Sequence, residues 1–441
     1  MKDLRRRLLL LGAAALLLPA CAAAALPAVE LTFQGCIALS LQNNLAVRLA
    51  QAGTAAARGR VLQSAAALLP RLTGSLSENR TFREDLPALG FKGGGFPELM
   101  GPFNTFDARV RLVAEVFDLP AILRLKSSGA DYRAAAMEES LAAEQVAGAA
   151  ALAYVELLRA RQAIASAAAD VELAASLRQL AEDKKHAGTA AGIAVARAKT
   201  REAEDKLAWL EARNVAQEAE VRLQRIVGLP WDRGVALKDE LGFQPSAPPQ
   251  AEAAILAARA DRWELRIAAE RLQAAKSQWQ AERSVRLPAV ALTGDVGLSG
   301  PDPDYRARTT GSAGVALQVP IFGAGAIAGR VREADGRRAA AESRLGDLRA
   351  QVEEDVRLAL IDLGAAVERV DTASEAERLA DEELAMARDR FAAGVADNVE
   401  LLNSQTALTH ARDVRVSALA RHQAARISLA LALGRMKDFA F

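Results

Sequence analysis

The chain carries the same series of landmarks twice. A Leu-Pro pair, a Val-Phe or Ile-Phe pair and two glycines follow one another in the same order in each half, about 205 to 218 residues apart. A repeat of this length is too long for a solenoid unit, so it predicts an internally duplicated fold with pseudo-twofold symmetry. The matched landmarks are Leu69-Pro70 with Leu287-Pro288, Val116-Phe117 with Ile321-Phe322, Gly188 with Gly394, and Gly228 with Gly434.

The composition favours long helices that pack closely side by side. Hydrophobic residues make up 51% of the 441 residues but aromatic residues only 4%, and alanine supplies the excess. Alanine is the best helix former, and small side chains let helices approach closely. The 56 basic and 55 acidic residues leave a net charge of +1. Because no long-range field would attract nucleic acid, we exclude it as a partner.

The N-terminus resembles an export signal over residues 1–25. Four basic residues among the first seven precede an apolar run from Leu8 to Leu18, which is too short to span a bilayer as a helix. The following LPAC sequence resembles a lipobox, which predicts a lipoprotein signal that ends at Ala20 and a lipid on Cys21. Ordinary cleavage within Ala22 to Ala25 is the alternative. No later stretch approaches 18 uninterrupted apolar residues, so any membrane insertion would be by β-strands.

Prolines mark the boundaries of two very long helical hairpins. None lies within residues 121–229 or 321–441, and proline disrupts helix interiors. A helix of about 65 residues would reach roughly 100 Å. We predict helices over Ala121 to His186, Gly188 to Gly228, Gly325 to Phe391 and Asn398 to Gly434, with shorter ones over Leu31 to Leu68 and Ala251 to Val285. The predicted organisation is an export signal at 1–25, a first repeat at 26–229, a linker at 230–250 and a second repeat at 251–441.

Short alternating segments predict four strands in two hairpins. Apolar residues alternate with Asp107, Arg109, Arg111 and Glu115 between positions 106 and 117, which is the period of a strand with one apolar face. The predicted strands are Arg71 to Asn79, Phe106 to Phe117, Ala289 to Leu298 and Ala313 to Val319. Two hairpins of a soluble sheet are the alternative, but the export signal and the long helices favour strands in a membrane.

Four strands cannot close a membrane barrel, which needs at least eight. An open sheet edge in lipid would leave backbone groups without hydrogen bonds, so the chain would have to oligomerise. A dimer would fill its barrel with side chains, whereas a trimer of twelve strands would leave a lumen. The charged inner face needs water and therefore favours the trimer.

Several motifs resemble those of the TolC-like outer-membrane factor family, also called outer membrane efflux proteins. They cover essentially the whole mature chain, and their duplicated order is more specific than any single motif. The matching segments are Leu31 to Leu39 with Asn43-Asn44, Ala67 to Leu72, Val116 to Asp118, and Gly394 with Val399 to Asn403.

The resemblance implies a mainly α fold with a membrane β-barrel portion. Long helical hairpins would form a periplasmic α-barrel, and four strands per protomer would contribute to the twelve-stranded barrel of a homotrimer. The protein would be a passive exit duct for efflux or type I secretion in the outer membrane, opened at its periplasmic tip by a periplasmic adaptor and an inner-membrane pump or ABC transporter. The alternative is an exported, soluble coiled-coil adaptor or structural protein. The sequence does not identify the cargo.

The resemblance also assigns site residues at the tip. Family members carry acidic residues at the positions of Glu400 and Asn403, where they form rings that narrow the tip and favour cations. Only Glu400 keeps the carboxylate here, and the alternative is a solvated helix residue. In the family, three further positions often carry polar side chains that link the hairpins across the closed tip. These positions hold Ala194, Ala396 and Phe391 here, whose side chains cannot form polar links. We therefore expect the tip to close by packing of small residues, with Phe391 as an apolar contact. Gly188 and Gly394 would form the tip turns.

Other polar residues carry no catalytic signature. We expect Asp397 and Asn398 to cap the final helix. His186, His410 and His422 are too scattered for a zinc site by local spacing, and we place His410 and His422 on exposed helix faces. The sequence also lacks a phosphate-binding glycine loop. We therefore predict no catalytic residue, no metal and no cofactor.

Overall fold

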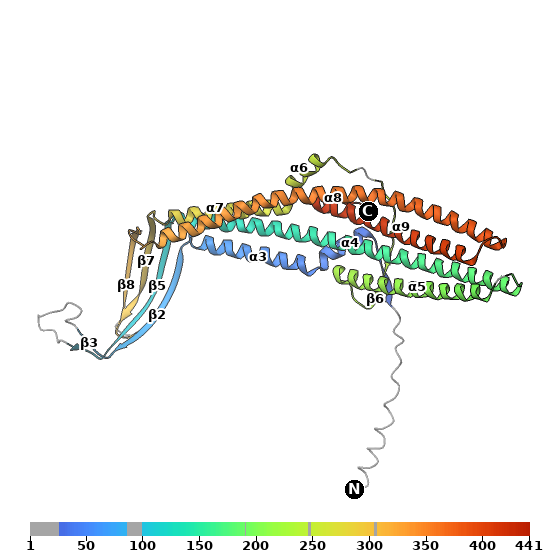
Figure 1. The fold of residues 1–441 in the computed structure, drawn as a ribbon. Helices are drawn as coiled ribbons and strands as arrows, with labels where there is room; N and C mark the ends of the chain where they lie inside the picture. Colours follow the sequence, from blue (N-terminus) through green and yellow to red (C-terminus); the bar gives the residue numbers. More distant parts are fainter. Residues whose placement is uncertain (1–25, 86–98, 190, 246–247, 304–306) are drawn as a thin grey trace, which may run out of the picture.

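The protein is an elongated bundle of long helices with a four-stranded sheet at one end (Figure 1). The computed structural model describes residues 26–85, 99–189, 191–245, 248–303 and 307–441. The export signal and Cys21 therefore lie outside the described residues. The helices are α2 (Phe33–Asn43), α3 (Leu45–Ala66), α4 (Leu119–His186), α5 (Gly192–Val227), α6 (Ala251–Asp261), α7 (Trp263–Ser284), α8 (Ala326–Ala392) and α9 (Asn398–Leu433), with a 3-10 turn η1 (Met436–Asp438).

The strands form one four-stranded sheet and two small pairs. Four antiparallel strands lie in the order β2, β5, β7, β8, and two-stranded pairs are formed by β1 with β6 and by β3 with β4. The predicted hairpins are thus confirmed, and the contact between β5 and β7 joins the two repeats. The strands are β1 (Leu26–Leu31), β2 (Arg71–Thr81), β3 (Glu84–Asp85), β4 (Leu99–Met100), β5 (Phe103–Phe117), β6 (Arg233–Leu237), β7 (Ala289–Gly300) and β8 (Arg308–Gln318).

The long helices begin and end where the sequence provides local signals. Before α4, the Asp118 side chain accepts a hydrogen bond from the backbone N–H of Ala121, and Pro120 occupies the first turn, where its missing N–H costs nothing. Lys184 and Lys185 in the last turn complement the helix dipole. At 1.5 Å per residue, its 68 residues reach roughly 100 Å. The predicted lengths of the four long helices are therefore confirmed.

Each of the two shorter predicted helices is interrupted, so the prediction of single helices was wrong. Asn44 separates α2 from α3, and its side chain caps α3 by accepting from the N–H of Ala46. Arg262 separates α6 from α7 at the equivalent position of the second repeat. The Asn44 side chain donates to the carbonyl of Ile226, and that of Arg262 donates to the carbonyl of Ala432. Both breaks are therefore fixed by contact with the end of the repeat's last helix.

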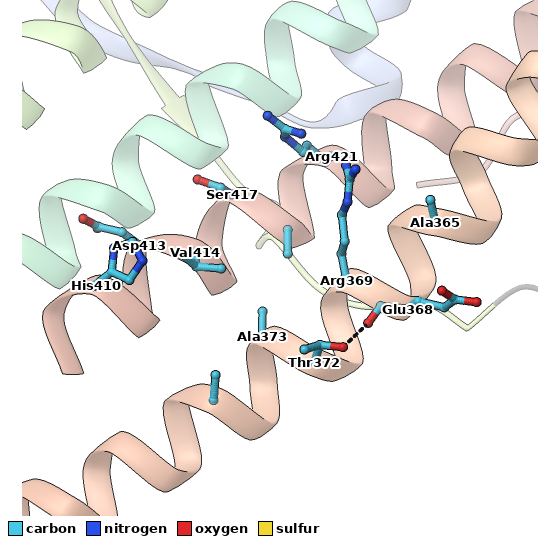
Figure 2. A pocket seen from close by; sticks show the side chains of 12 residues that line it. Ala365, Glu368, Arg369, Thr372, Ala373, His410, Asp413, Val414, Ser417 and Arg421 are labelled. Carbon is cyan, nitrogen blue, oxygen red and sulfur yellow. Dashed lines mark hydrogen bonds between the residues drawn. The ribbon is translucent and has the colours of Figure 1, made fainter. Parts of the chain in front are cut away.

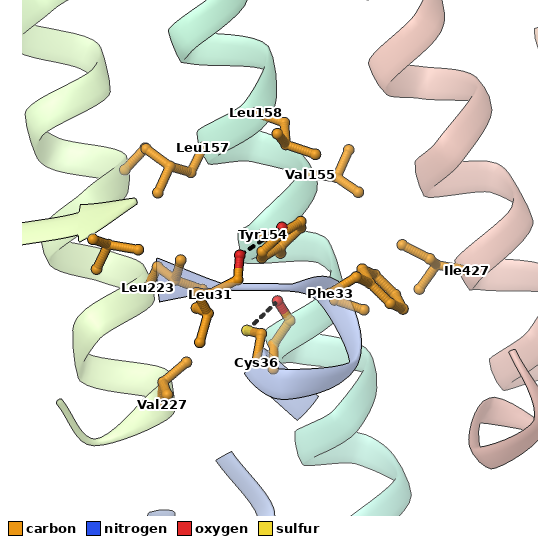
Figure 3. Close-up of a cluster of buried hydrophobic side chains, with 14 of the residues drawn as sticks. Leu31, Phe33, Cys36, Tyr154, Val155, Leu157, Leu158, Leu223, Val227 and Ile427 are labelled. Atoms are coloured by element: carbon orange, nitrogen blue, oxygen red, sulfur yellow. Dashed lines mark hydrogen bonds between the residues drawn. The ribbon is translucent and has the colours of Figure 1, made fainter. Parts of the chain in front are cut away.

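The helix α4 is the centre of the bundle. It packs against α3 and α5 of its own repeat and against α7 and α9 of the other. Where α2 crosses it, a core forms around Tyr154, whose hydroxyl lies 3.1 Å from the Leu31 carbonyl oxygen (Figure 3). The same hydroxyl is 2.6 Å from a carboxylate oxygen of Asp239, so its single proton is shared between these two acceptors. The Phe33 ring meets the Tyr154 ring edge-on, with 5.7 Å between centroids. This core uses residues from both repeats and from the linker.

The helix α4 also contains a stretch apolar enough to cross a membrane by length and composition. Of that stretch, 56% is buried within the chain. A core helix of a helical bundle has the same composition, and the buried side chains of Ala150, Ala151 and Leu157 pack against neighbouring helices. We therefore interpret α4 as the central helix of the bundle.

Candidate functional site

Two glycine turns close the hairpins at the end of the bundle opposite the sheet (Figure 1). Gly188 follows α4 and Gly394 follows α8, and their φ angles are +75° and +76°. In each turn the glycine N–H and the next N–H bond back to carbonyls of the last helical turn, which is the Schellman arrangement. The duplicated glycines thus make equivalent turns, as the sequence predicted, and a residue with a Cβ would be strained in either.

Phe391 lies between the hairpins just before the second turn. Its side chain is buried in a cluster with Leu177, Leu384 and Leu401, which fits the apolar contact expected for it. The Lys184 ammonium lies 4.6 Å from the centre of the Phe391 ring and also donates to the Phe391 backbone carbonyl. The ends of α4 and α8 are therefore joined by a cation–π contact and a hydrogen bond.

A second polar link joins the starts of α5 and α9. The side-chain amide of Asn398 is buried and donates to the backbone carbonyl of Ala194 at 3.3 Å. Asp397 occupies the N-cap position of α9, but its side chain makes no capping hydrogen bond. The expected capping role was therefore wrong for both residues. The side chains of Ala194 and Phe391 cannot form polar links. Their backbone carbonyls nevertheless accept hydrogen bonds, from Asn398 and from Lys184 respectively.

Glu400 and Asn403 lie on the exposed face of α9, one turn apart. The Glu400 carboxylate is 3.2 Å from Nε of Arg390, within its own hairpin, and its side chain is 43% exposed. An ion pair this open to solvent is weak. The carboxylate is therefore accessible, and its place in a constriction stays a prediction.

One buried and one part-buried polar contact continue the link between the hairpins away from the tip. The Gln405 amide donates to the Asp205 carboxylate at 3.0 Å, and Arg412 donates to Asp170 at 2.8 Å. Burial raises the pKa of Asp205 above its ordinary value, although the Arg201 guanidinium acts in the opposite direction. The sequence did not predict these contacts, because each joins residues about 200 or more positions apart.

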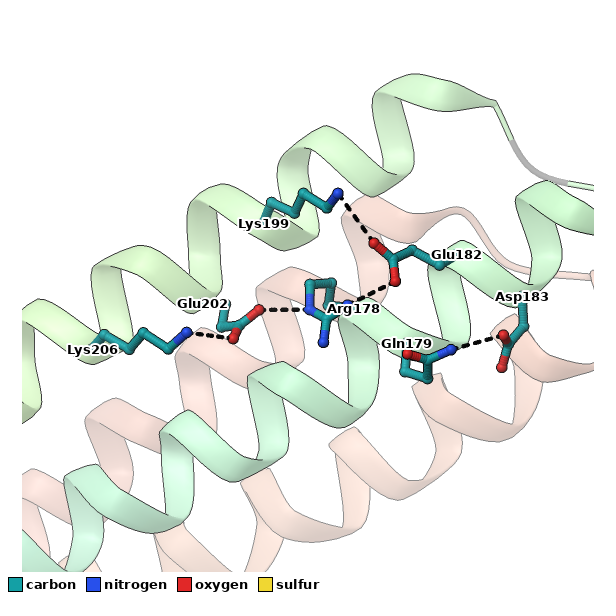
Figure 4. Close-up of polar contacts among 7 residues, drawn as sticks. All are labelled: Arg178, Gln179, Glu182, Asp183, Lys199, Glu202 and Lys206. Atoms are coloured by element: carbon teal, nitrogen blue, oxygen red, sulfur yellow. Dashed lines mark hydrogen bonds and ion pairs between the residues drawn. The ribbon is translucent and has the colours of Figure 1, made fainter.

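The first hairpin is held together by a network of ion pairs near its tip (Figure 4). Arg178 of α4 contacts Glu202 of α5 and Glu182 of its own helix, each at 2.7 Å. Lys199 and Lys206 extend the network from α5. Several linked charges hold a geometry better than an isolated pair, so α4 and α5 behave as one unit at this end.

The four-stranded sheet has one apolar and one polar face. On the polar face, Arg109 binds Asp107 through two nitrogens and reaches Asp295 of the other repeat at 2.7 Å. On the opposite face the large side chains are exposed, with Leu76 at 74% and Val315 at 70%. An exposed apolar face of this kind marks contact with a membrane or another protein. Further exposed residues of that face are Leu72, Val110, Leu292, Val296, Leu298 and Leu317.

A groove of about 650 Å³ runs between α8 and α9 (Figure 2). Its floor contains Ala373, Val414 and Ala418, and Arg369 and Arg421 lie at one end. The groove carries no constellation of catalytic groups. Within the described part of the chain, no group of three His, Cys, Asp or Glu side chains could hold a metal ion.

One histidine prediction needs correction. His410 is exposed and lines the groove, as expected. His422 is fully buried instead of exposed, because the linker covers this side of α9 and places the ring of Phe243 4.9 Å from the imidazole. The pattern of polar residues on α9 predicted an exposed face, and it could not show that a distant linker segment covers His422.

One family model matches the second half of the chain. Residues 254–435 match the model described as outer membrane efflux protein. The match covers most of the second predicted repeat. None of the curated proteins matches the sequence. The resemblance of the chain to the outer membrane efflux protein family is confirmed, and that family and its fold are those of outer-membrane channels and not of enzymes.

Solved outer-membrane channels share the fold of nearly the whole chain. The outer membrane protein VceC of Vibrio cholerae is 20% identical, with a TM-score of 0.81 over 91% of this chain and 96% of that one. The CmeC channel of Campylobacter jejuni is 18% identical, with a TM-score of 0.82 over 91% and 85%. The MtrE channel of Neisseria gonorrhoeae, in its open state, is 18% identical, with a TM-score of 0.78 over 91% and 88%. The predicted mainly α fold with a β portion is therefore confirmed.

Proposed function

We propose that the protein is a homotrimeric outer-membrane channel that serves as the exit duct of a tripartite efflux or type I secretion system. The observation that supports this most directly is the four-stranded sheet with one exposed apolar face, attached to helices of 67 and 68 residues. In this proposal the sheet lies in the outer membrane and the helical hairpins extend into the periplasm. The apolar face contacts lipid, and the face with Arg109 lines the water-filled lumen.

Oligomerisation follows from the sheet edges. Both β2 and β8 are edge strands of the chain's four-stranded sheet, and lipid offers no hydrogen bonds to an open edge. Pairing β2 of one copy with β8 of the next would close the sheet, and three copies give twelve strands. Exposed apolar residues on the helices, such as Leu207, Leu210, Ile361 and Leu379, would then be covered by neighbouring copies.

The tip would be the gate of this duct. The contacts of Lys184 and Asn398 hold the two hairpins together there, and Glu400 would form a ring of three carboxylates that attracts cations. A periplasmic adaptor and an inner-membrane pump or ABC transporter would loosen the tip, and the duct itself would be a passive conduit.

We also propose domain bounds for this chain. The first efflux repeat would span residues 26–229 and the second residues 251–441, with a linker at 230–250. The strand β6 lies inside that linker and pairs with β1, so part of the linker belongs to the folded body. The export signal would occupy residues 1–25.

The proposal is tested with the full-length protein purified from membranes in detergent. A trimer that resists heating before electrophoresis and conducts ions across a planar bilayer would support the channel. The rival function, an exported soluble coiled-coil adaptor, would give a protein that is released without detergent and does not conduct. A detergent-solubilised monomer, or a trimer without conductance, would contradict the channel proposal.

A further inference from the structure

His422 of α9 is a buried titratable group without a hydrogen-bond partner. The residue is 0% exposed, and neither Nδ1 nor Nε2 has a partner among the described residues. A neutral imidazole carries one donor and one acceptor, and leaving both unsatisfied in the interior is unfavourable. Such a group in a folded protein calls for an explanation, and nothing in the proposed channel function uses it.

The segment that buries His422 comes from the linker between the repeats. We call residues 239–243 the strap. At its first end, the Asp239 carboxylate accepts hydrogen bonds from the backbone N–H of Phe33 and from the Tyr154 hydroxyl, at 2.7 and 2.6 Å. The strap then crosses to α8 and α9, where it lies over the second hairpin.

Two contacts attach the far end of the strap to α9. The Gln423 amide donates to the Gly242 carbonyl at 2.7 Å. The Phe243 ring lies against the His422 imidazole, with the ring planes 56° apart, and it packs with Leu241 in a small cluster. The other members of that cluster are Val370, Ala373, Ala418 and Leu419.

The surroundings of His422 favour its neutral form. Burial lowers the pKa of His422 below its ordinary value, and the Arg426 guanidinium lowers it further. Glu240 of the strap and Arg369 of α8 are the sequence neighbours of the packed residues Leu241 and Val370. Among the described residues, Arg426 is the one charged group that shifts the pKa of His422. Arg426 stays in place because it donates to Gln423 and to the Ala440 carbonyl.

We propose that His422 is a proton-operated release for the strap, so that protonation of the buried imidazole displaces Phe243 and frees the far end of the strap, residues 241–243, from α9. An imidazolium needs two acceptors, and this site provides neither. The strap is the element that yields, because it is a short irregular segment with exposed neighbours, whereas α9 is held by buried contacts along its whole length.

The direction of the pH effect follows from the lowered pKa. The released state binds a proton at the ordinary pKa of a histidine, about 6.5, whereas the attached state binds it less readily. Attachment is therefore fully favourable above that value and weakens as the pH falls below it. Each pH unit below it can raise the ratio of released to attached strap by up to about tenfold, until the attached state is protonated as well.

A spin label on the strap provides the test. Glu240 is exposed, so a nitroxide on Glu240→Cys of the full-length protein in detergent reports the mobility of the strap by electron paramagnetic resonance. We expect the mobile fraction to rise severalfold between pH 7.5 and pH 5.5, with little change above pH 7. The same label on Asp362→Cys, on an exposed face of α8, should show no such rise.

Variants in the labelled background decide whether His422 is responsible. His422→Phe cannot titrate and should keep the strap immobile at both pH values, with His422→Gln as a substitute if the larger ring prevents folding. His410→Phe, at an exposed position, should behave as the wild type. Arg426→Gln narrows the pKa gap and should reduce the rise without abolishing it. A wild-type strap equally immobile at both pH values, or a rise that persists in the His422 variants, would overturn the proposal. Channel activity does not enter this readout.

Discussion

At the tip, single side chains connect the hairpins through backbone atoms. Lys184 and Asn398 each donate to a carbonyl of the other hairpin. Phe391 was expected as an apolar contact because the family resemblance aligns it with a position that often carries a polar link. The sequence did not predict Lys184 or Asn398, because any residue can supply the accepting carbonyl and each contact spans more than 200 positions. The family resemblance singled out Glu400 through its place after the turn, but not its ion-pair partner Arg390.

Removing the carboxylate of Glu400 should change ion selectivity. In the proposed trimer, Glu400→Gln deletes three negative charges from the tip, so cation selectivity and block by multivalent cations should both decrease. Reversal potentials in planar bilayers measure this. Glu218→Gln, an exposed acidic residue on α5 paired with Arg222, should leave selectivity unchanged. An unaltered reversal potential in Glu400→Gln would show that Glu400 does not line the constriction.

Removing both tip links should favour an open gate. In the double variant Lys184→Ala, Asn398→Ala, the hairpins lose a charge-assisted and a neutral hydrogen bond, together about 2–4 kcal/mol per chain at most. We expect a higher mean conductance in planar bilayers. Lys206→Ala, which removes a lysine bound within the first hairpin, serves as the control. Equal conductance of the double variant and the wild type would mean that other contacts hold the tip.

The lipobox-like sequence makes a prediction at Cys21. If the signal ends at Ala20, mass spectrometry of the mature N-terminus should find diacylglycerol on Cys21, and Cys21→Ser should abolish it. An unmodified alanine at the start of the mature chain would instead support cleavage within Ala22 to Ala25. Membrane anchoring by the sheet would then act alone.

At the level of elements, the ends of the long helices follow from proline and glycine. The sequence placed these helices to within a few residues because both residue types act locally. It missed the breaks at Asn44 and Arg262, because each is set by packing on the last helix of the repeat. The strands of the main sheet were recognised by alternation, whereas β1 and β6 are short and pair across about 200 residues of chain.

The glycines that follow the long helices differ in how much space surrounds them, so substitutions at these positions should differ in their cost. Gly228 and Gly394 have φ angles of +73° and +76°. A Cβ at Gly394 would meet nothing within 4 Å, whereas one at Gly228 would lie 2.7 Å from the Asn43 Cβ. Gly394→Ala should therefore cost about 1 kcal/mol, and Gly228→Ala should cost more because the helix break must also move.

Thermal unfolding of the detergent-solubilised protein measures both effects. Gly346→Ala is a suitable control, since this glycine lies inside α8 with open space around it. It should be neutral or slightly stabilising, because alanine is a better helix former by roughly 0.5–1 kcal/mol. Equal melting temperatures for the Gly228 and Gly394 variants would contradict the role of the close approach to Asn43.

At the scale of the whole molecule, the two faces of the sheet decide where the protein can insert. Neighbouring residues of β2 point to opposite faces, so Leu76 belongs to the apolar face and Ser75 to the polar face. This alternation can be read from the residue pattern, and it predicts which face each strand residue occupies. It did not predict the ion pair of Arg109 with Asp295, which joins strands from different repeats.

Lysine substitutions on the two faces of β2 can distinguish the face that contacts lipid from the face that lines the lumen. Leu76→Lys should reduce the yield of heat-resistant trimer in the outer membrane, because a lysine facing lipid costs up to about 2–4 kcal/mol per copy at the bilayer midplane. Ser75→Lys faces water in the proposed lumen and should assemble normally. Similar yields of both variants, measured by electrophoresis without boiling, would contradict the membrane orientation of the sheet.

The central position of α4 has a consequence for biosynthesis. One side of this helix, and the second edge of β5, are completed by α7, α9 and β7, all of which lie beyond residue 262. A polypeptide that has been exported only as far as the linker therefore exposes the apolar side of α4 and the backbone N–H and C=O groups at one edge of β5. Folding cannot finish one half at a time, and the emerging chain should depend on holding chaperones until its later segments arrive.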